Sequence, residues 1–392
     1  MHTENEIIAR LNRVDWNFPG STTSDVSIHS LHWFPGNYIP QIPSYMIQLL
    51  SDPGDLVCDP FCGSGTTGVE ALYLDRNIIL SDINQVSIHV TNAKLAAVHS
   101  PAVQEFLVRL VTELMWESIL KSPNFGRNGE GKSDELKHWY HPDTLLQLNY
   151  LWNLVESTER LESRRVLEMV FTDTLFDCAA ARGTATATGG RRRHHWGWVA
   201  DNVLPKPPHR HNAIRLFRKR LVHAIDVLQM PQPNMPLKLE SLVIRSDVRR
   251  LPIASQSVDL IVTSPPYLCM IDYALANRLT YLWMNWPLQE DRNAEIGARF
   301  TRHRQSAFNE YLTAMDEACC HIGRVLRKGG YCAIVIGASA KYSSAAKSAI
   351  ELFEKRLRLV WGPTPRSSSR RRLSARTGRT PTEWVCVFRK ES

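Results

Sequence analysis

The sequence of 392 residues predicts an α/β fold in which a doubly wound, mostly parallel sheet carries a largely helical insertion. Three observations support this prediction. Short apolar strands alternate with amphipathic helices before residue 95, the same alternation resumes after residue 240, and the stretch between them has helical spacing only. Alternating strands and helices are typical of a parallel sheet covered on both faces. Hydrophobic residues make up 43% and charged residues 22%, which excludes a wholly disordered or coiled-coil chain.

The N-terminal half contains a helix, a strand, a glycine-rich loop, a helix and a second strand. In order, they are predicted at residues 42–50, 56–58, 59–67 (DPFCGSGTT), 68–74 and 77–80. The helix at 42–50 ends at a Ser-Asp-Pro-Gly turn, and the second strand ends at Asp82. We refer to residues 59–67 as the glycine loop.

The glycine loop has the composition of a ligand-binding turn. Gly63 and Gly65 let the backbone turn tightly, while the next helix points its amide groups at the same place. Asp82 falls where such folds hold ribose hydroxyls. Because Gly63, Gly65 and Gly68 satisfy G-x-G-x-x-G, spacing alone leaves a dinucleotide open. Asp59 disfavours it, since a pyrophosphate would meet a carboxylate. A phosphate-binding P-loop is disfavoured too, because the expected lysine is missing.

The C-terminal half repeats the alternation. Strands and one helix are predicted at 242–244, 259–262, 311–326 (the helix), 331–336 and 384–388. The strand at 259–262 runs into Thr-Ser-Pro-Pro-Tyr at 263–267, which we call the proline loop. Consecutive prolines fix the backbone. The Ser264 hydroxyl, the Pro265 carbonyl and the flat face of Tyr267 suit a planar base that bears an amino group. A rigid turn that caps the strand is the simpler alternative.

Together the two loops resemble those of the S-adenosylmethionine-dependent DNA amino-methyltransferases, which methylate exocyclic nitrogens of cytosine or adenine. The resemblance covers about residues 30–95 and 241–390. It implies a Rossmann-like methyltransferase sheet, S-adenosyl-L-methionine as cofactor and double-stranded DNA as partner. A cognate restriction nuclease is a further partner that the resemblance allows. The implied organisation is one methyltransferase domain in two halves, 1–95 and 241–392, around a target-recognition insertion, 96–240.

Residue by residue, the resemblance implies two groups of site residues. Those implied to contact the cofactor are Asn37, Asp59, Phe61, Gly63, Gly65, Thr66, Asp82 and Asp247. Those implied to be catalytic are Ser264, Pro265, Pro266 and Tyr267. Serine at 264 is most often associated with cytosine N4, whereas Asp or Asn there accompanies adenine N6. We therefore expect a site-specific cytosine-N4 methyltransferase that acts on a flipped-out base. The alternatives are an adenine-N6 enzyme, an RNA amino-methyltransferase and a catalytically silent nucleic-acid-binding protein.

The positive charge is concentrated in two segments. The net charge is +8, yet residues 182–220 carry ten Lys and Arg against one acid, and residues 355–392 carry eleven against two. Such segments are typical of polyanion-binding surfaces, and solvated basic loops are the alternative. The residues predicted to contact nucleic acid are Arg191, Arg192, Arg193, Trp196, Arg278, Arg370, Arg371 and Arg372. For Arg278 a packing role is the alternative.

The remaining composition predicts no metal and no membrane contact. The eight cysteines form no C-x-x-C pair, so we expect buried free thiols, and the histidines have no ligand spacing. No apolar run approaches eighteen residues, and the first residues carry acids where a signal peptide would be apolar. We therefore expect a cytoplasmic protein, and the sequence leaves its oligomeric state open.

Overall fold

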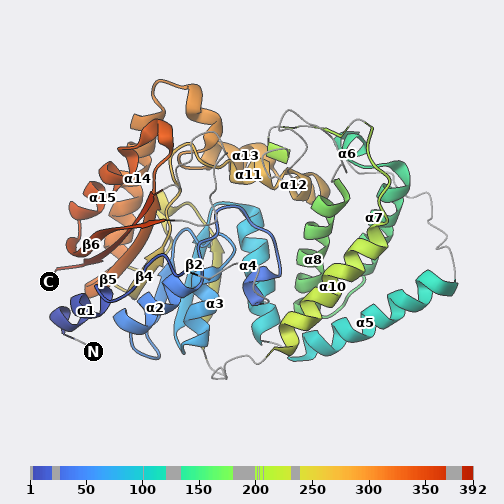
Figure 1. Ribbon diagram of the computed structural model, residues 1–392, viewed down its shortest axis with the longest axis horizontal. Helices are drawn as coiled ribbons and strands as arrows, with labels where there is room; N and C mark the ends of the chain where they lie inside the picture. Colours follow the sequence, from blue (N-terminus) through green and yellow to red (C-terminus); the bar gives the residue numbers. More distant parts are fainter. Residues whose placement is uncertain are drawn as a thin grey trace.

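The computed structural model describes residues 3–19, 27–99, 101–120, 134–179, 199–200, 202, 204–205, 207–230, 239–367 and 382–391. Its centre is a seven-stranded sheet with the order β3-β2-β1-β4-β5-β7-β6 (Figure 1). The strands are β1 (Leu56–Asp59), β2 (Asn77–Asp82), β3 (Ser241–Arg245), β4 (Val258–Thr263), β5 (Leu326–Gly337), β6 (Arg358–Ser367) and β7 (Thr382–Arg389).

The sheet is mostly parallel. Strands β1 to β5 run in one direction, and β7 lies antiparallel between β5 and β6. The predicted α/β fold with a doubly wound, mostly parallel sheet is thus confirmed. The chain passes from β1 outward through β2 to β3 and then returns to the other side of β1 with β4. The carboxyl ends of β1 and β4 therefore flank a topological switch point, where such sheets bind ligands.

Helices cover both faces of the sheet. One core packs against α2 (Gln41–Leu50), α3 (Thr66–Tyr73) and α4 (Gln85–His99), and it receives Leu260 and Val262 of β4. The other packs against α14 (Ala307–Val325) and α15 (Ala345–Glu354), and it receives Ile261. Successive side chains of a strand point to opposite faces, so a continuous apolar run fills both cores.

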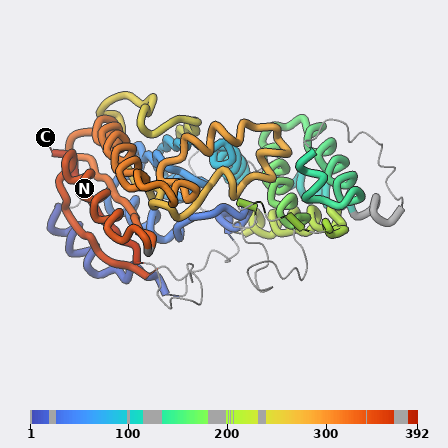
Figure 2. The backbone as a smooth tube through the Cα atoms, turned by 90° about the horizontal axis from the view of Figure 1, so that it is seen from above, coloured from blue at the N-terminus to red at the C-terminus, as the bar shows by residue number. Residues whose placement is uncertain are grey.

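The described part of the insertion is helical and lies beside α4, at the opposite end of the molecule from β6 and β7 (Figures 1 and 2). Its helices are α5 (Pro101–Leu120), α6 (Asp134–Trp139), α7 (Pro142–Glu156), α8 (Leu161–Ala179) and α10 (Ala213–Gln229). Helix α8 packs against α4, α7 and α10. Asn212 caps α10 by accepting a hydrogen bond from the Arg215 N–H at 2.8 Å. The helix α4 continues past residue 95, and the three-part division stays a prediction.

The chain after the proline loop differs from its prediction. The apolar spacing of residues 270–283 predicts one amphipathic helix, but the structure has two, α11 (Tyr273–Ala276) and α12 (Arg278–Met284), followed by α13 (Leu288–Ala294). Asn277 separates the first two, because its side-chain amide donates to the Tyr273 carbonyl and ends that helix. The remaining elements are α1 (Glu4–Leu11) and the short 3₁₀ turns η1 (Ile28–Ser30), η2 (Val248–Arg250), η3 (Arg299–His303) and η4 (Ala340–Tyr342).

All eight cysteines are free thiols, and six of them are buried, as the sequence predicts. Among the described residues, no helix combines the length and apolar character that a membrane span needs. The same residues hold no cluster of three or more His, Cys, Asp or Glu arranged for a metal ion.

Candidate functional site

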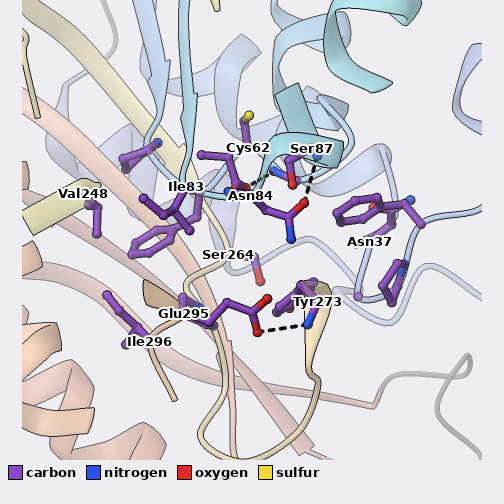
Figure 3. A pocket seen from close by; sticks show the side chains of 18 of the residues that line it. Asn37, Cys62, Ile83, Asn84, Ser87, Val248, Ser264, Tyr273, Glu295 and Ile296 are labelled. Atoms are coloured by element: carbon purple, nitrogen blue, oxygen red, sulfur yellow. Dashed lines mark hydrogen bonds between the residues drawn. The ribbon is translucent and has the colours of Figure 1, made fainter. Parts of the chain in front are cut away.

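A partly open cavity lies at the carboxyl ends of β1, β2 and β4 (Figure 3). It is lined by Phe34, Pro35, Gly36, Asn37, Tyr38, Pro60, Phe61, Cys62, Gly63, Thr66, Asp82, Ile83, Asn84, Ser87, Ser246, Asp247, Val248, Ser264, Pro266, Tyr273, Ala294, Glu295 and Ile296. Both sequence motifs therefore contribute to one cavity.

The glycine loop forms one wall of this cavity. Gly63 has φ +51° and Gly65 has φ +79°, values that favour glycine. The turn brings the Gly63 N–H to 2.9 Å from one oxygen of Asp82, and the Asn84 N–H donates to the other oxygen, also at 2.9 Å. Burial raises the pKa of Asp82 to about 6, although these two hydrogen bonds act in the opposite direction. The carboxylate is thus fixed at the end of β2 and faces the cavity.

Asp247 is the second acid at the wall. It begins the turn η2 by accepting a hydrogen bond from the Arg249 N–H at 2.9 Å, and the Arg249 guanidinium contacts both of its oxygens. Burial would raise the pKa of Asp247, but the hydrogen bonds from Arg249 outweigh it and hold the pKa below its ordinary value. Asp247 is therefore ionised across the physiological range.

The proline loop contributes Ser264 and Pro266 to the wall. The Pro266 carbonyl accepts a hydrogen bond from the Tyr311 hydroxyl at 3.1 Å, which ties the loop to α14. The Tyr267 side chain is 7% exposed, packs where a Cβ on Gly337 would stand, and donates to Glu383 at 3.3 Å. Ser264 Oγ lies 3.5 Å from the Tyr267 hydroxyl. The proline loop is thus fixed by Tyr311 of α14 and by the buried side chain of its own Tyr267.

Asp59 connects the two loops. Its buried carboxylate accepts hydrogen bonds from the Thr67 hydroxyl at 2.5 Å and from the Thr263 hydroxyl at 2.6 Å. Burial raises the pKa of Asp59 to about 6, and the hydrogen bonds from Thr263 and Thr67 oppose that rise. Since Thr263 immediately precedes Ser264, this carboxylate fixes the start of the proline loop against the glycine loop.

The structure brings eight of the twelve expected site residues to the cavity wall: Asn37, Phe61, Gly63, Thr66, Asp82, Asp247, Ser264 and Pro266. It does not bring Asp59, Gly65, Pro265 or Tyr267 there. Asp59 and Tyr267 support the loops from behind, and the position of a Cβ on Gly65 is already taken by Thr91.

The expected nucleic-acid contacts are mostly outside the described residues. This holds for Arg191, Arg192, Arg193, Trp196, Arg370, Arg371 and Arg372. Arg278 is described, and its side chain is 18% exposed, with Nε 2.9 Å from a carboxylate oxygen of Glu135 on α6. In this arrangement Arg278 joins the segment after the proline loop to the insertion.

Sequence reasoning missed the part of the wall that follows the proline loop. Glu295 accepts hydrogen bonds from the N–H groups of Tyr273 and Ala274, and its side chain points toward the same space as Ser264 (Figure 3). Burial raises its pKa well above the ordinary value. Nothing in the sequence marks Glu295, because it lies 31 positions after Ser264, beyond three short helices. Phe34 and Tyr38 also line the wall, and both precede the helix predicted at 42–50.

The charge of the cavity decides which ligand fits. Its wall carries three carboxylates, on Asp82, Asp247 and Glu295, and no Lys, Arg or His among the lining residues that the structure describes. A pyrophosphate would meet the Asp82 carboxylate with no Lys, Arg or His among the described lining residues beside it, which disfavours a dinucleotide. A ligand with ribose hydroxyls, an amino group and net positive charge does fit. S-Adenosylmethionine, which carries a sulfonium, has these groups. The strand order and this cavity match what the resemblance to S-adenosylmethionine-dependent methyltransferases predicts.

Comparisons with known proteins agree with this class. Residues 16–93 match the model of the DNA methylase family whose members methylate N6 or N4 amines. The Type II methyltransferase M.MjaII of Methanocaldococcus jannaschii is 20% identical over 83% of this chain and 75% of its own length. M.MvaI of Kocuria varians, another Type II methyltransferase, is 21% identical over 70% of this chain and 61% of its own length.

Among solved structures, a TehB-like methyltransferase from Corynebacterium glutamicum is 9% identical, with a TM-score of 0.32 over 89% of this chain and 87% of its own. This chain is thus similar to DNA methylases in residues 16–93 and, at 20–21% identity, to two Type II methyltransferases.

Proposed function

We propose that this protein transfers a methyl group from S-adenosylmethionine to the N4 amine of a cytosine flipped out of double-stranded DNA. The observation that carries the proposal is the position of Ser264, which lines the same cavity as Phe61, Gly63 and Thr66. A hydroxyl at this position, where related enzymes that act on adenine usually have Asp or Asn, favours cytosine.

The wall residues have separate tasks in this scheme. Asp82 accepts hydrogen bonds from ribose hydroxyls, Asp247 accepts one from the adenine amine, and Asn37 lies beside the donor. The bound donor supplies a methyl group on a positively charged sulfur. Because Asp82 and Asp247 are held by backbone and arginine contacts, they are ordered before any ligand arrives.

The proline loop holds the acceptor. The cytosine amine is a weak nucleophile because its lone pair is delocalised into the ring. If the Ser264 hydroxyl and the Pro265 carbonyl accept hydrogen bonds from its two N–H groups, the nitrogen pyramidalises and its lone pair points at the methyl group. As the new N–C bond forms, the S–C bond breaks and S-adenosylhomocysteine leaves, and the methylated nitrogen then loses one proton to water. Correct placement of two reactants contributes about 7–11 kcal/mol, so no strong base is needed. Tyr267 stays the expected stacking face, and because its ring is buried, base entry has to expose it.

Identification of the methylated nucleoside tests the proposal. The protein is incubated with labelled S-adenosylmethionine and either duplex DNA or tRNA, and the digest is separated by mass. We expect N4-methylcytosine from DNA. Methyladenine alone would establish the adenine-N6 alternative, which the family description also covers. Label in tRNA alone would establish an RNA enzyme, and donor binding without any product would indicate a silent protein.

A substitution tests the role of Ser264. We expect Ser264→Ala to lower kcat by roughly 10- to 100-fold, because one buried hydrogen bond worth ~1–3 kcal/mol is lost. Donor affinity should be unchanged. Ser257→Ala is the matched control, since the Ser257 hydroxyl donates to the Ala254 carbonyl within its own turn before β4 and the residue does not line the cavity. Full activity in Ser264→Ala would contradict the assigned hydrogen bond.

A further inference from the structure

A buried polar cluster joins the insertion to the methyltransferase domain. It contains Asp173 of α8, Lys94 of α4 and His32, whose exposed fractions are 1%, 0% and 2%. Arg220 of α10 places a guanidinium nitrogen 2.6 Å from Asp173. The Lys94 ammonium has no hydrogen-bond partner among the described residues. Isolating charges in a core is costly, and Asp173 is the acid whose charge acts on Lys94 and also pairs with Arg220.

The same cluster holds one end of a chain segment, residues 29–38, which we call the strap. Asp173 accepts a hydrogen bond from the Trp33 N–H at 3.2 Å, and a ring nitrogen of His32 lies 3.2 Å from the Thr172 hydroxyl. The Trp33 ring packs against Phe176, with centroids 5.7 Å apart. Every one of these partners is on α8. The strap is therefore anchored to α8 by the backbone N–H of Trp33 and by the side chains of His32 and Trp33.

The other end of the strap forms the cavity wall. Phe34 follows Trp33 directly, and it lines the cavity together with Pro35, Gly36, Asn37 and Tyr38. Phe34 stacks on Tyr273 at 6.2 Å, and a Cβ on Gly36 would come within 2.9 Å of the Tyr273 hydroxyl. If Trp33 shifts, Phe34 and Gly36 therefore shift with it, and their close contacts displace Tyr273.

From these contacts we infer that Asp173 is a positioning residue that couples the insertion to the donor cavity. A movement of α8 or α10, such as DNA engagement by the insertion would impose, shifts Trp33 and with it the wall from Phe34 to Tyr38. DNA binding therefore tightens donor binding, and the coupling is reciprocal. This inference rests on the proposed function, because it presumes that the cavity holds the donor and that the insertion meets DNA.

Calorimetric binding of S-adenosylhomocysteine, with and without sheared duplex DNA, tests the inference without measuring activity. The main variant is Lys94→Met with Asp173→Leu, which removes both buried charges, so the core keeps no isolated lysine. We expect it to fold, to bind S-adenosylhomocysteine about tenfold more weakly, and to lose the tightening by DNA. Asp173→Asn keeps an oxygen for the Trp33 N–H and should restore the affinity to within about twofold.

Asp177→Asn is the matched control. Asp177 also pairs with Arg220, at 2.7 Å, whereas the Trp33 N–H of the strap donates to Asp173. We expect affinity within about twofold of the wild type. If the double variant fails to fold, Phe176→Ala replaces it, since that change loosens Trp33 and alters no charge. Wild-type affinity in either variant would overturn the inference. A wild-type protein that does not bind S-adenosylhomocysteine at all would instead overturn the proposed function.

Discussion

At the scale of single residues, Asp82 makes donor binding depend on pH. Its pKa is about 6 because of burial, so the carboxylate is ionised above that pH and protonated below it. Only the ionised form accepts hydrogen bonds from two ribose hydroxyls. We expect the affinity for S-adenosylhomocysteine to be constant from about pH 7 upward and to fall as the pH drops through about 6, by up to tenfold per pH unit. Calorimetry between pH 5 and 8 measures this.

Two variants separate Asp82 from the other acids. Asp82→Asn should bind weakly at every pH, with a flat profile. Asp247→Asn should also bind weakly but keep the fall near pH 6, because Arg249 holds the pKa of Asp247 below its ordinary value and that group does not titrate in this range. A flat profile in the wild type would contradict a role for the Asp82 titration in donor binding. A persisting fall in Asp82→Asn would assign the titration to another group, for example Asp59, whose pKa is also about 6.

At the scale of elements, the strands that could be predicted are those that depend on the apolar pattern of their own residues. Strands β1 to β5 were predictable because continuous apolar runs end at turn residues. Strand β6 was not, because Arg358–Ser367 contains two prolines and three residues with charged or hydroxyl side chains near its end. What makes it a strand is distant in sequence: Arg366 pairs with Glu383 of β7, and the Trp361 indole donates to Asn12. Glu295 could not be predicted for the same reason, because its position depends on a hydrogen bond from the Tyr273 N–H of α11, which is distant in the sequence.

Arg366 of β6 and Glu383 of β7 form a buried ion pair in addition to the backbone ladder between the two strands. Both side chains are nearly inaccessible, at 5% and 6%, and Glu383 also accepts from the Tyr267 hydroxyl. We expect Glu383→Ala to lower the free energy of unfolding by about 3–5 kcal/mol, because it leaves a buried guanidinium without its partner. Urea denaturation followed by tryptophan fluorescence measures the loss.

Comparison with an exposed ion pair gives the control. Lys347 and Glu351 lie on α15 with their charged atoms 4.0 Å apart and their side chains 83% and 55% exposed. Glu351→Ala should leave the denaturation midpoint unchanged. Replacing both members of the buried pair, with Arg366→Met and Glu383→Leu, should recover most of the stability that Glu383→Ala loses. Equal effects of Glu383→Ala and Glu351→Ala would mean that the buried pair adds nothing to the β6 edge.

At the scale of the whole molecule, the positive charge is concentrated in two segments of the chain. The two basic segments at 182–220 and 355–392 each have a net charge of +9, so the remainder of the chain has an excess of ten acidic residues. The acid-lined cavity belongs to that remainder. We expect the basic segments to contact DNA and a single flipped-out base to enter the cavity. Binding by such segments depends on counterion release and weakens steeply with salt.

Salt titration assigns the DNA-binding segment. Each phosphate contact that is lost lowers the slope of log K against log salt concentration by about 0.9. If residues 191–193 lie on DNA, the triple replacement of Arg191, Arg192 and Arg193 by alanine should lower the slope by about 2–3, measured by fluorescence anisotropy with a duplex. The same replacement of Arg370, Arg371 and Arg372 tests the second segment separately, and Lys347→Ala on the exposed face of α15 is the control. An unchanged slope in both triple variants would mean that neither arginine run lies on DNA, and that the phosphates are met by other cations of the chain.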